Sequence, residues 1–318
     1  MSRLGSRNKS RRHHKDNTSG RKELKEHALF SQDTLVGCCG TAGLALKDYA
    51  KRFRVIEVQS TFYRLPKPET ARRWKESTLG QDFEFTLKAF QGITHPLESP
   101  TWRRAGPKDI LEKVRKEDVG FLRESSFVLK CLRSIIEIAK ILESRVIVFQ
   151  MPPSFEYSQG NLESIEKFFT HVLPSAISSS FSSSQRSEVF SPALELRHWS
   201  WFSEKSRLWD LAGKISKARE SRQSLAPLLV TDPLRDEQRA FKEILLLQQQ
   251  QIAYHRLHGL GRSFTNYKYK YADTDLRNLL DSVLSARRLG TRQYILFNNI
   301  SMRDDAERFS KLLVSTLS

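Results

Sequence analysis

Short apolar runs that alternate with longer helical stretches constrain the fold of this chain more than any other feature. Several of these runs are too continuously apolar to have a face in water, which is typical of parallel strands that are covered on both faces. The runs are TLVGCC (34–39), RVIEVQ (54–59), FEFTLKA (83–89), RVIVFQ (145–150), ALELR (193–197), APLLVT (226–231), QIAYHRL (251–257) and RQYILFN (292–298).

The stretches between the runs have helical periodicity. In the clearest one, 118–142, apolar residues recur at spacings of three and four and so share one face. Further helices are expected over PKPETARRW (66–74), from Asp273 to the basic residues before Gly290, and over DDAERFSKLLVSTL (304–317).

Eight runs, each followed by a helix or by room for one, predict a closed TIM-type (β/α)8 barrel with eight parallel strands. The alternative is an open, doubly wound sheet. That alternative is disfavoured because GCCGTAG (37–43), at the end of the first run, lacks the spacing of a glycine-rich phosphate-binding fingerprint.

One barrel domain is expected over residues 31–318, preceded by a basic tail over 1–30. Much of the net charge of +17 lies in the first 27 residues, which have few apolar side chains and are expected to be disordered. Such a tail could bind nucleic acid, or serve only as a solvated leader. Within the domain, 91–117 predict a long loop and 175–192 a flexible, serine-rich insertion.

The sequence predicts a cytoplasmic protein without a membrane partner. No apolar run approaches the roughly 20 residues that span a bilayer, and the basic start of the chain lacks the apolar segment of a secretory signal. Three cysteines, Cys38, Cys39 and Cys131, form neither a disulfide framework nor a zinc pattern, so we expect reduced thiols.

Polar side chains follow nearly every run, at the end where the barrel's active-site mouth would form. In chain order they are Glu57, Gln59, Lys88, His95, Gln150, Glu195, Arg197, His198, Asp232, Arg256, His258, Asn298 and Asn299. The opposite ends of the runs look like ordinary solvated strand starts. This one-sided placement indicates a functional site, and Gly259 would let the backbone turn sharply out of the seventh strand.

Six ordered motifs carry a resemblance to a known family. They are VIEVQSTFYRLPKPETARRW, FEFTLKA followed by ITH, VFQMPPSF, LELRHWSWF, YHRLHG and LFNN. From about Val36 to the C-terminus the chain resembles the YecE-like family, domain of unknown function 72. The resemblance implies a (β/α)8 barrel that is distantly similar to the xylose isomerase and endonuclease IV barrels, and it names no reaction.

The family's motifs fall on the same polar positions. Its pattern VEINSTFY lies over 55–63 with one extra residue, and Gln59 stands where the family usually has Asn. Its early GTSGW is replaced by GCCGTAG, without the tryptophan. The remaining motifs imply site positions at Lys88, His95, Gln150, Glu195, Arg197, His198, Trp201, Asp232, Arg256, His258, Gly259, Asn298 and Asn299.

The residue types at these positions predict an anionic ligand and proton transfer. Lys88, Arg197 and Arg256 would bind phosphate or carboxylate. Either Glu57 or Glu195 would be the base and His258 the acid, with Asp232 as a further catalytic carboxyl. The predicted substrate-binding residues are Gln59, Tyr63, Lys88, His95, Gln150, Arg197, His198, Arg256 and Asn298.

Other interpretations of the same residues stay open. Glu195, Arg197 and Arg256 could pair with one another simply to neutralise the upper layer of the barrel, and His95 could only cap its loop. The acids could instead hold a single Mg²⁺ or Mn²⁺. A three-zinc cluster is disfavoured, because only three of the eight histidines follow strand ends.

Two functions are therefore expected as alternatives. The first is a cytosolic barrel enzyme, a hydrolase or lyase, that acts on an anionic, phosphorylated or nucleic-acid-derived substrate at the mouth. The second is a nucleic-acid-binding protein with little or no catalysis. It would use the basic tail and the NYKYKY loop (266–271), in which tyrosines that could stack on bases alternate with lysines.

Overall fold

Eight parallel strands close into a barrel in the order in which they occur along the chain, with β8 paired to β1. This computed structural model describes residues 33–104, 114–180, 190–220, 225–235, 252–286 and 292–317. The strands are β1 (Thr34–Cys39), β2 (Val55–Val58), β3 (Glu84–Lys88), β4 (Val146–Gln150), β5 (Ser191–Glu195), β6 (Leu228–Thr231), β7 (Ile252–Leu257) and β8 (Arg292–Phe297). The predicted (β/α)8 barrel is confirmed.

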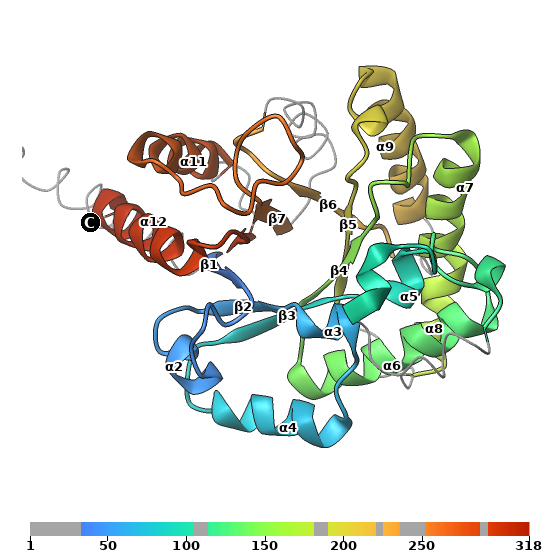
Figure 1. Cartoon of the computed structure of the whole chain (residues 1–318), viewed down its shortest axis with the longest axis horizontal. Coiled ribbons are helices and arrows are strands. Elements are labelled where there is room, and N and C mark those ends of the chain that lie inside the picture. The colour runs from blue at the N-terminus through green and yellow to red at the C-terminus, as the bar shows by residue number, and fades with distance from the viewer. Residues whose placement is uncertain are drawn as a thin grey trace, which may run out of the picture.

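Helices surround the strands on the outside of the barrel (Figure 1). The α-helices are α2 (Leu46–Ala50), α3 (Ser60–Tyr63), α4 (Pro68–Ser77), α5 (Gln91–Thr94), α6 (Ser126–Leu142), α7 (Gln159–Lys167), α8 (Leu173–Ser178), α9 (Lys205–Glu220), α11 (Asp273–Ala286) and α12 (Met302–Leu317). Shorter turns are η1 (Pro100–Arg104), η3 (Lys116–Asp118), the π-helical η4 (Phe168–Val172) and η6 (Trp199–Trp201). None of the helices in the described ranges has the length and apolarity needed to cross a bilayer.

Three predicted segments differ from the structure. The long loop predicted over 91–117 contains the short helix α5 and the turn η1, and η3 begins at Lys116. The helix predicted over 118–142 begins only at Ser126, because the Ser125 side chain caps it by accepting the Val128 amide proton. The insertion predicted over 175–192 is wrong at both ends, since α8 extends to Ser178 and β5 begins at Ser191. Its middle, 181–189, lies outside the described residues, as does the whole basic tail predicted over 1–30.

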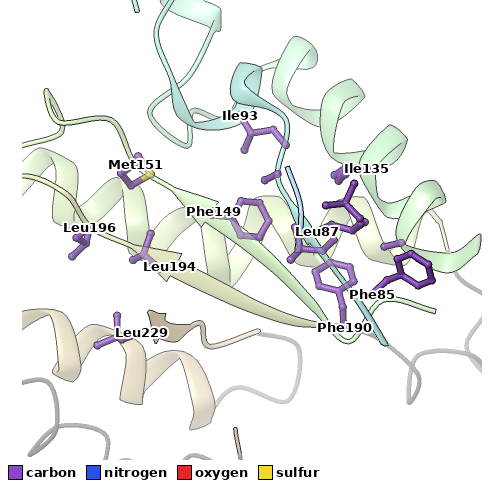
Figure 2. Close-up of a cluster of buried hydrophobic side chains, with 14 of the residues drawn as sticks. Phe85, Leu87, Ile93, Ile135, Phe149, Met151, Phe190, Leu194, Leu196 and Leu229 are labelled. Carbon is purple, nitrogen blue, oxygen red and sulfur yellow. The ribbon is translucent and has the colours of Figure 1, made fainter. Parts of the chain in front are cut away.

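Alternation along the strands divides the core into two layers. Side chains such as Val148, Tyr254 and Leu296 fill the barrel interior. Their neighbours along the strands face outward and pack against the helices, as Phe85, Leu87, Phe149, Leu194 and Leu229 do in Figure 2. The interior is therefore a packed core below the mouth.

The opposite end of the barrel carries its own polar cluster. Glu84 begins β3 and forms an ion pair with Arg292, which begins β8, while Tyr294 donates its hydroxyl proton to Glu84 at 2.7 Å. Arg292 is still partly solvated, as expected of a strand start, with 32% of its side chain exposed. These side chains lie in the same inward rows as Thr86 and Leu296, and they close the floor of the barrel.

Tyr49 ties the first two strands together from helix α2. Its buried hydroxyl accepts the Cys38 amide proton at 2.7 Å and donates to the Val55 carbonyl at 2.9 Å. Gly37 lies beside this junction, where a Cβ atom would stand 2.0 Å from the Val55 oxygen. Only glycine therefore fits the approach of β1 to β2 at this point.

We expect Tyr49→Phe to lower the free energy of unfolding by about 1–3 kcal/mol, because it leaves a buried amide and a buried carbonyl without a partner. Urea denaturation measures the change. The matched control is Tyr267→Phe, since Tyr267 is 42% exposed, and it should stay within about 0.5 kcal/mol of the wild type. Equal stability of the two variants would refute the role of the Tyr49 hydroxyl.

Candidate active site

Arg256 forms the centre of a buried ion network at the C-terminal mouth of the barrel. Its side chain is fully buried, donates to Glu57 at 2.8 Å and forms a second ion pair with Glu195. Nη1 also donates to the Gln150 amide oxygen at 3.1 Å. One guanidinium therefore connects β2, β4, β5 and β7, which the sequence places almost 200 residues apart.

Glu57 accepts further hydrogen bonds from inside the barrel. Tyr254, two residues before Arg256 and in the same inward row, donates its hydroxyl proton at 2.9 Å. The Gln59 amide donates to the other oxygen. Below them, Thr86 and Tyr254 are joined by a hydroxyl–hydroxyl hydrogen bond of 2.7 Å. Every oxygen of this buried carboxylate thus has a donor.

Glu195 is the second hub of the network. Arg197 donates from Nε at 2.9 Å, and the Nε2 atom of His258 lies 2.9 Å from the same carboxylate oxygen. Burial raises the pKa of Glu195, but the charges of Arg197 and Arg256 outweigh it and hold the pKa well below its usual range. Glu195 is therefore an ionised carboxylate at neutral pH.

His258 is held as a neutral ring. The Asn298 amide nitrogen lies 3.0 Å from Nδ1, while Nε2 lies 2.9 Å from Glu195 and 3.1 Å from Nη2 of Arg197. Burial, followed by the charge of Arg197, lowers the pKa of His258 to about 3. The chain then turns away at Gly259, whose φ of +80° and close approach to the Asn266 carbonyl confirm the predicted need for glycine.

Lys88 lies at the mouth but takes no part in these ion pairs. Its Nζ lies 3.7 Å above the centroid of the Phe62 ring, and within the described part of the chain it has no hydrogen bond or ion pair. Burial, then the charges of Arg256 and Arg197, lower the pKa of Lys88 to about 7. Lys88 therefore loses its proton much more readily than an exposed lysine does.

His95 also contacts the Phe62 ring. Its ring meets Phe62 edge-on at 4.8 Å and its Nδ1 is 2.8 Å from the Thr94 hydroxyl. Burial, then the charge of Lys88, lower the pKa of His95 to about 3. It is a neutral neighbour of Lys88, and Tyr63 extends the same ring cluster, with its centroid 5.0 Å from that of Phe62.

A second loop fixes the segment that carries His95. Gly120, Phe121 and Leu122 all have positive φ, and their amides donate to carbonyl groups of α5 at 2.9 to 3.1 Å. A Cβ atom on Gly120 would stand 2.4 Å from the His95 carbonyl carbon. A left-handed backbone conformation costs free energy for residues other than glycine. The contacts of Phe121 and Leu122 with α5 stabilise this conformation and so fix the position of the loop.

Asp232 and Arg235 form a separate buried pair after β6. Asp232 accepts the Leu234 amide proton at 3.1 Å, and its Oδ2 lies 3.7 Å from Arg235 Nε. Burial is the largest effect on this carboxyl and raises its pKa to about 7. A recess at the mouth joins Asp232 to the ion network, with Glu195, Arg256, His258 and Phe264 in its walls.

Some predicted positions lie outside this cluster. His198 bonds to Ser200 in its own turn at 2.7 Å, and Asn299 donates to Tyr269 and Asp305. The NYKYKY stretch is also not a platform of three rings: Tyr267 is exposed, Tyr269 donates to Asp275, and Tyr271 is buried and accepts the Gly259 amide proton.

The sequence analysis missed Phe62, Thr86, Tyr254 and Arg235 as parts of the site. Tyr254 could have been found, because it shares the inward row of Arg256. Arg235 carried no comparable signal, since it follows the strand. In the part of the chain that the structure describes, no three His, Cys, Asp or Glu side chains converge as metal ligands would, so the Mg²⁺ or Mn²⁺ that the sequence left open gains no ligand set there.

Fold and site together define a (β/α)8-barrel protein with a buried, ion-paired mouth, and comparison with known proteins gives its family. The chain belongs to the family described as "Protein of unknown function DUF72", whose model matches residues 37–318. A stretch of 51 residues is 43% identical to the YecE protein of Escherichia coli (strain K12), a match that covers 16% of the chain and 18% of YecE. The resemblance found from the motifs is confirmed.

Solved structures agree with the fold. A DUF72 family protein of Enterococcus faecalis V583 is 16% identical, with a TM-score of 0.56 over 89% of this chain and 97% of that one. The corresponding values for a DUF72 family protein of Thermotoga maritima MSB8 are 19%, 0.52, 88% and 99%. A D-psicose 3-epimerase of Clostridium cellulolyticum H10 is 9% identical, with a TM-score of 0.50 over 88% and 97%. At these identities the likeness shows the fold alone.

We expect Arg256→Met to lower the free energy of unfolding by about 3–5 kcal/mol, because it leaves two buried carboxylates without their counter-ion. Urea denaturation measures the loss. Arg72→Met removes a guanidinium whose partner Glu69 lies 3.7 Å away on the surface, and this control should change stability by less than about 1 kcal/mol. Similar losses in both variants would contradict the central role of Arg256.

Lys88→Met should become more stable relative to the wild type as pH falls from 10 to 7. An unfolded lysine is protonated below about 10.4, whereas folded Lys88 is protonated only below about 7. Between these values the unfolded state binds more protons, so the wild type loses up to about 1.4 kcal/mol per pH unit that the variant keeps. Urea denaturation of both proteins at pH 7, 8.5 and 10 measures the difference. A constant difference across this range would mean that the pKa of Lys88 is not lowered.

Proposed function

We propose that the protein is an enzyme that binds a small anionic substrate at the barrel mouth and transfers protons there. The observation that supports this most directly is the charge of Lys88. Glu57 and Glu195 are matched by Arg197 and Arg256, and Asp232 lies beside Arg235. Lys88 then remains as a buried cation without a carboxylate partner among the described residues, and such a charge is costly unless an anion accompanies it.

The ligand class follows from this surplus positive charge. A carboxylate or a phosphate group would complete the neutralisation of the mouth and accept charge-assisted hydrogen bonds from Lys88. The guanidiniums of Arg197 and Arg256 already form ion pairs with Glu195 and Glu57. In this proposal they contribute to the electrostatic potential at the mouth, and Lys88 contacts the anion.

The same side chains favour proton transfer at neutral pH. A general acid or base works best when its pKa lies near the working pH, and burial brings both Lys88 and Asp232 to about 7. In this proposal Asp232 takes the acid role that the sequence suggested for His258, because a ring with a pKa of about 3 stays neutral at pH 7. His258 and Asn298 instead orient Glu195.

The alternative, nucleic-acid binding without catalysis, has less support. It relied on the basic tail, which lies outside the described residues, and on three tyrosines of which Tyr271 is buried. A cytoplasmic location remains part of the proposal and agrees with three buried cysteines that form no disulfide.

Anion binding tests the proposal. Isothermal titration calorimetry with sulfate, whose charge is constant between pH 6 and 9, should give an affinity that falls as pH rises above 7, by up to about tenfold per pH unit, because the ammonium form of Lys88 is the one that binds. Lys88→Met should bind at least about tenfold more weakly at pH 6.5.

Two controls make the result specific. Lys88→Arg keeps the charge at every pH, so its sulfate affinity should not depend on pH in this range. Lys270→Met removes an exposed lysine that pairs with Asp304 and should bind as the wild type does. The proposal fails if the wild type binds no sulfate, or if Lys88→Met and the wild type bind it equally.

A further inference from the structure

Lys88 combines two features that an anion-binding lysine does not need. Its side chain is only 6% exposed, and the cationic groups with the largest effect on it are the guanidiniums of Arg256 and Arg197, which cannot lose a proton. Exposed Lys270 pairs with the carboxylate of Asp304 without any of these constraints. The arrangement instead destabilises the ammonium form.

The titratable and charged groups around Lys88 come from four elements or the loops that follow them. Arg256 from β7 and Arg197 after β5 disfavour its ammonium form, and Glu195 from β5 and Glu57 from β2 favour it less strongly. His95, which follows α5, is a neutral ring. Because both glutamates are already bound by arginines, desolvation dominates and the pKa of Lys88 falls to about 7. A lysine that is desolvated and lies beside other cations is an activated amine nucleophile.

We propose that Lys88 forms an imine with the substrate, and that the substrate is a small aldehyde or ketone that carries a carboxylate or phosphate group. This inference rests on the proposed function for the anionic group. It adds the carbonyl group and names Nζ as the atom that forms the bond.

Imine formation at Lys88 conserves both atoms and charge. The lone pair of the neutral amine attacks the carbonyl carbon, a C–N bond forms, and the carbonyl oxygen takes a proton to give a carbinolamine. A second proton transfer moves the amine hydrogen to the hydroxyl group, which leaves as water. In total, one amine, one carbonyl and one proton give one protonated imine and one water, with no oxidant or reductant.

The mouth suits the protonated imine. Nζ keeps a positive charge after the bond forms, so the anionic group of the substrate still faces a cation. The ring of Phe62 lies 3.7 Å below that charge, and Glu57 and Glu195 stabilise it electrostatically. A protonated imine withdraws electrons from the neighbouring carbon, which favours C–H or C–C cleavage there and agrees with a lyase.

Reductive trapping tests the inference on the whole chain. The protein is incubated at pH 7.5 with pyruvate or dihydroxyacetone phosphate and sodium cyanoborohydride, which reduces a protonated imine to a stable amine, and the modified lysines are located by peptide mass spectrometry. At this pH an ordinary lysine is about 0.1% neutral amine. We expect Lys88 to be labelled at least tenfold faster than Lys270, with a rate that rises through pH 7.

Further experiments distinguish imine formation at Lys88 from anion binding alone. Acetone has the carbonyl group without the anion and should label Lys88 more slowly than pyruvate. Lys88→Arg should lose the specific adduct while retaining sulfate binding, and Lys270→Arg should keep the adduct.

The inference is overturned if Lys88 is labelled no faster than Lys270 in the wild type, a comparison that needs no variant to fold. If that happens while sulfate still binds, Lys88 serves for anion binding only. If neither sulfate nor label is found, the proposed function fails as well.

Discussion

One guanidinium inside the barrel determines how the mouth is built. Two carboxylates buried at this depth would each cost several kcal/mol without a counter-ion, and Arg256 contacts both of them. Once it does so, the remaining oxygens are taken by Tyr254, Gln59, Arg197 and His258. The acids and arginines of this network therefore neutralise one another, and in the proposed function the reactive groups are Lys88 and Asp232, which lie outside the network.

Strand parity made most of the site predictable. Side chains two residues apart share a face, so the ends of eight apolar runs had to point into one mouth once the barrel was recognised. The interpretation in which Glu195, Arg197 and Arg256 pair with one another is correct in the structure. Pairing with Glu57, however, depends on the stagger of the strands and on the reach of each side chain, which the sequence does not contain. His198 lies beyond the end of β5, where parity no longer applies.

The burial of charged side chains was harder to predict from the sequence than their positions. Charged residues at strand starts are usually solvated, which hid the inward pair of Glu84 and Arg292. The same limit applies to Lys88, because its position was predictable, but its lack of a counter-ion among the described residues was not. Whether a lysine is an ordinary cation or a reactive amine depends on neighbours that come from distant parts of the chain. Sequence patterns located the groups, and only coordinates could show which of them neutralise one another.

The closed floor of the barrel affects how a ligand can enter and leave the site. Glu84, Arg292 and Tyr294 lie at the lower opening, and the packed interior above them, which includes Tyr254 and Leu296, separates this opening from the mouth. Whatever enters must leave by the same route. If the protein is an enzyme as proposed, a slowly departing product would obstruct the next substrate molecule.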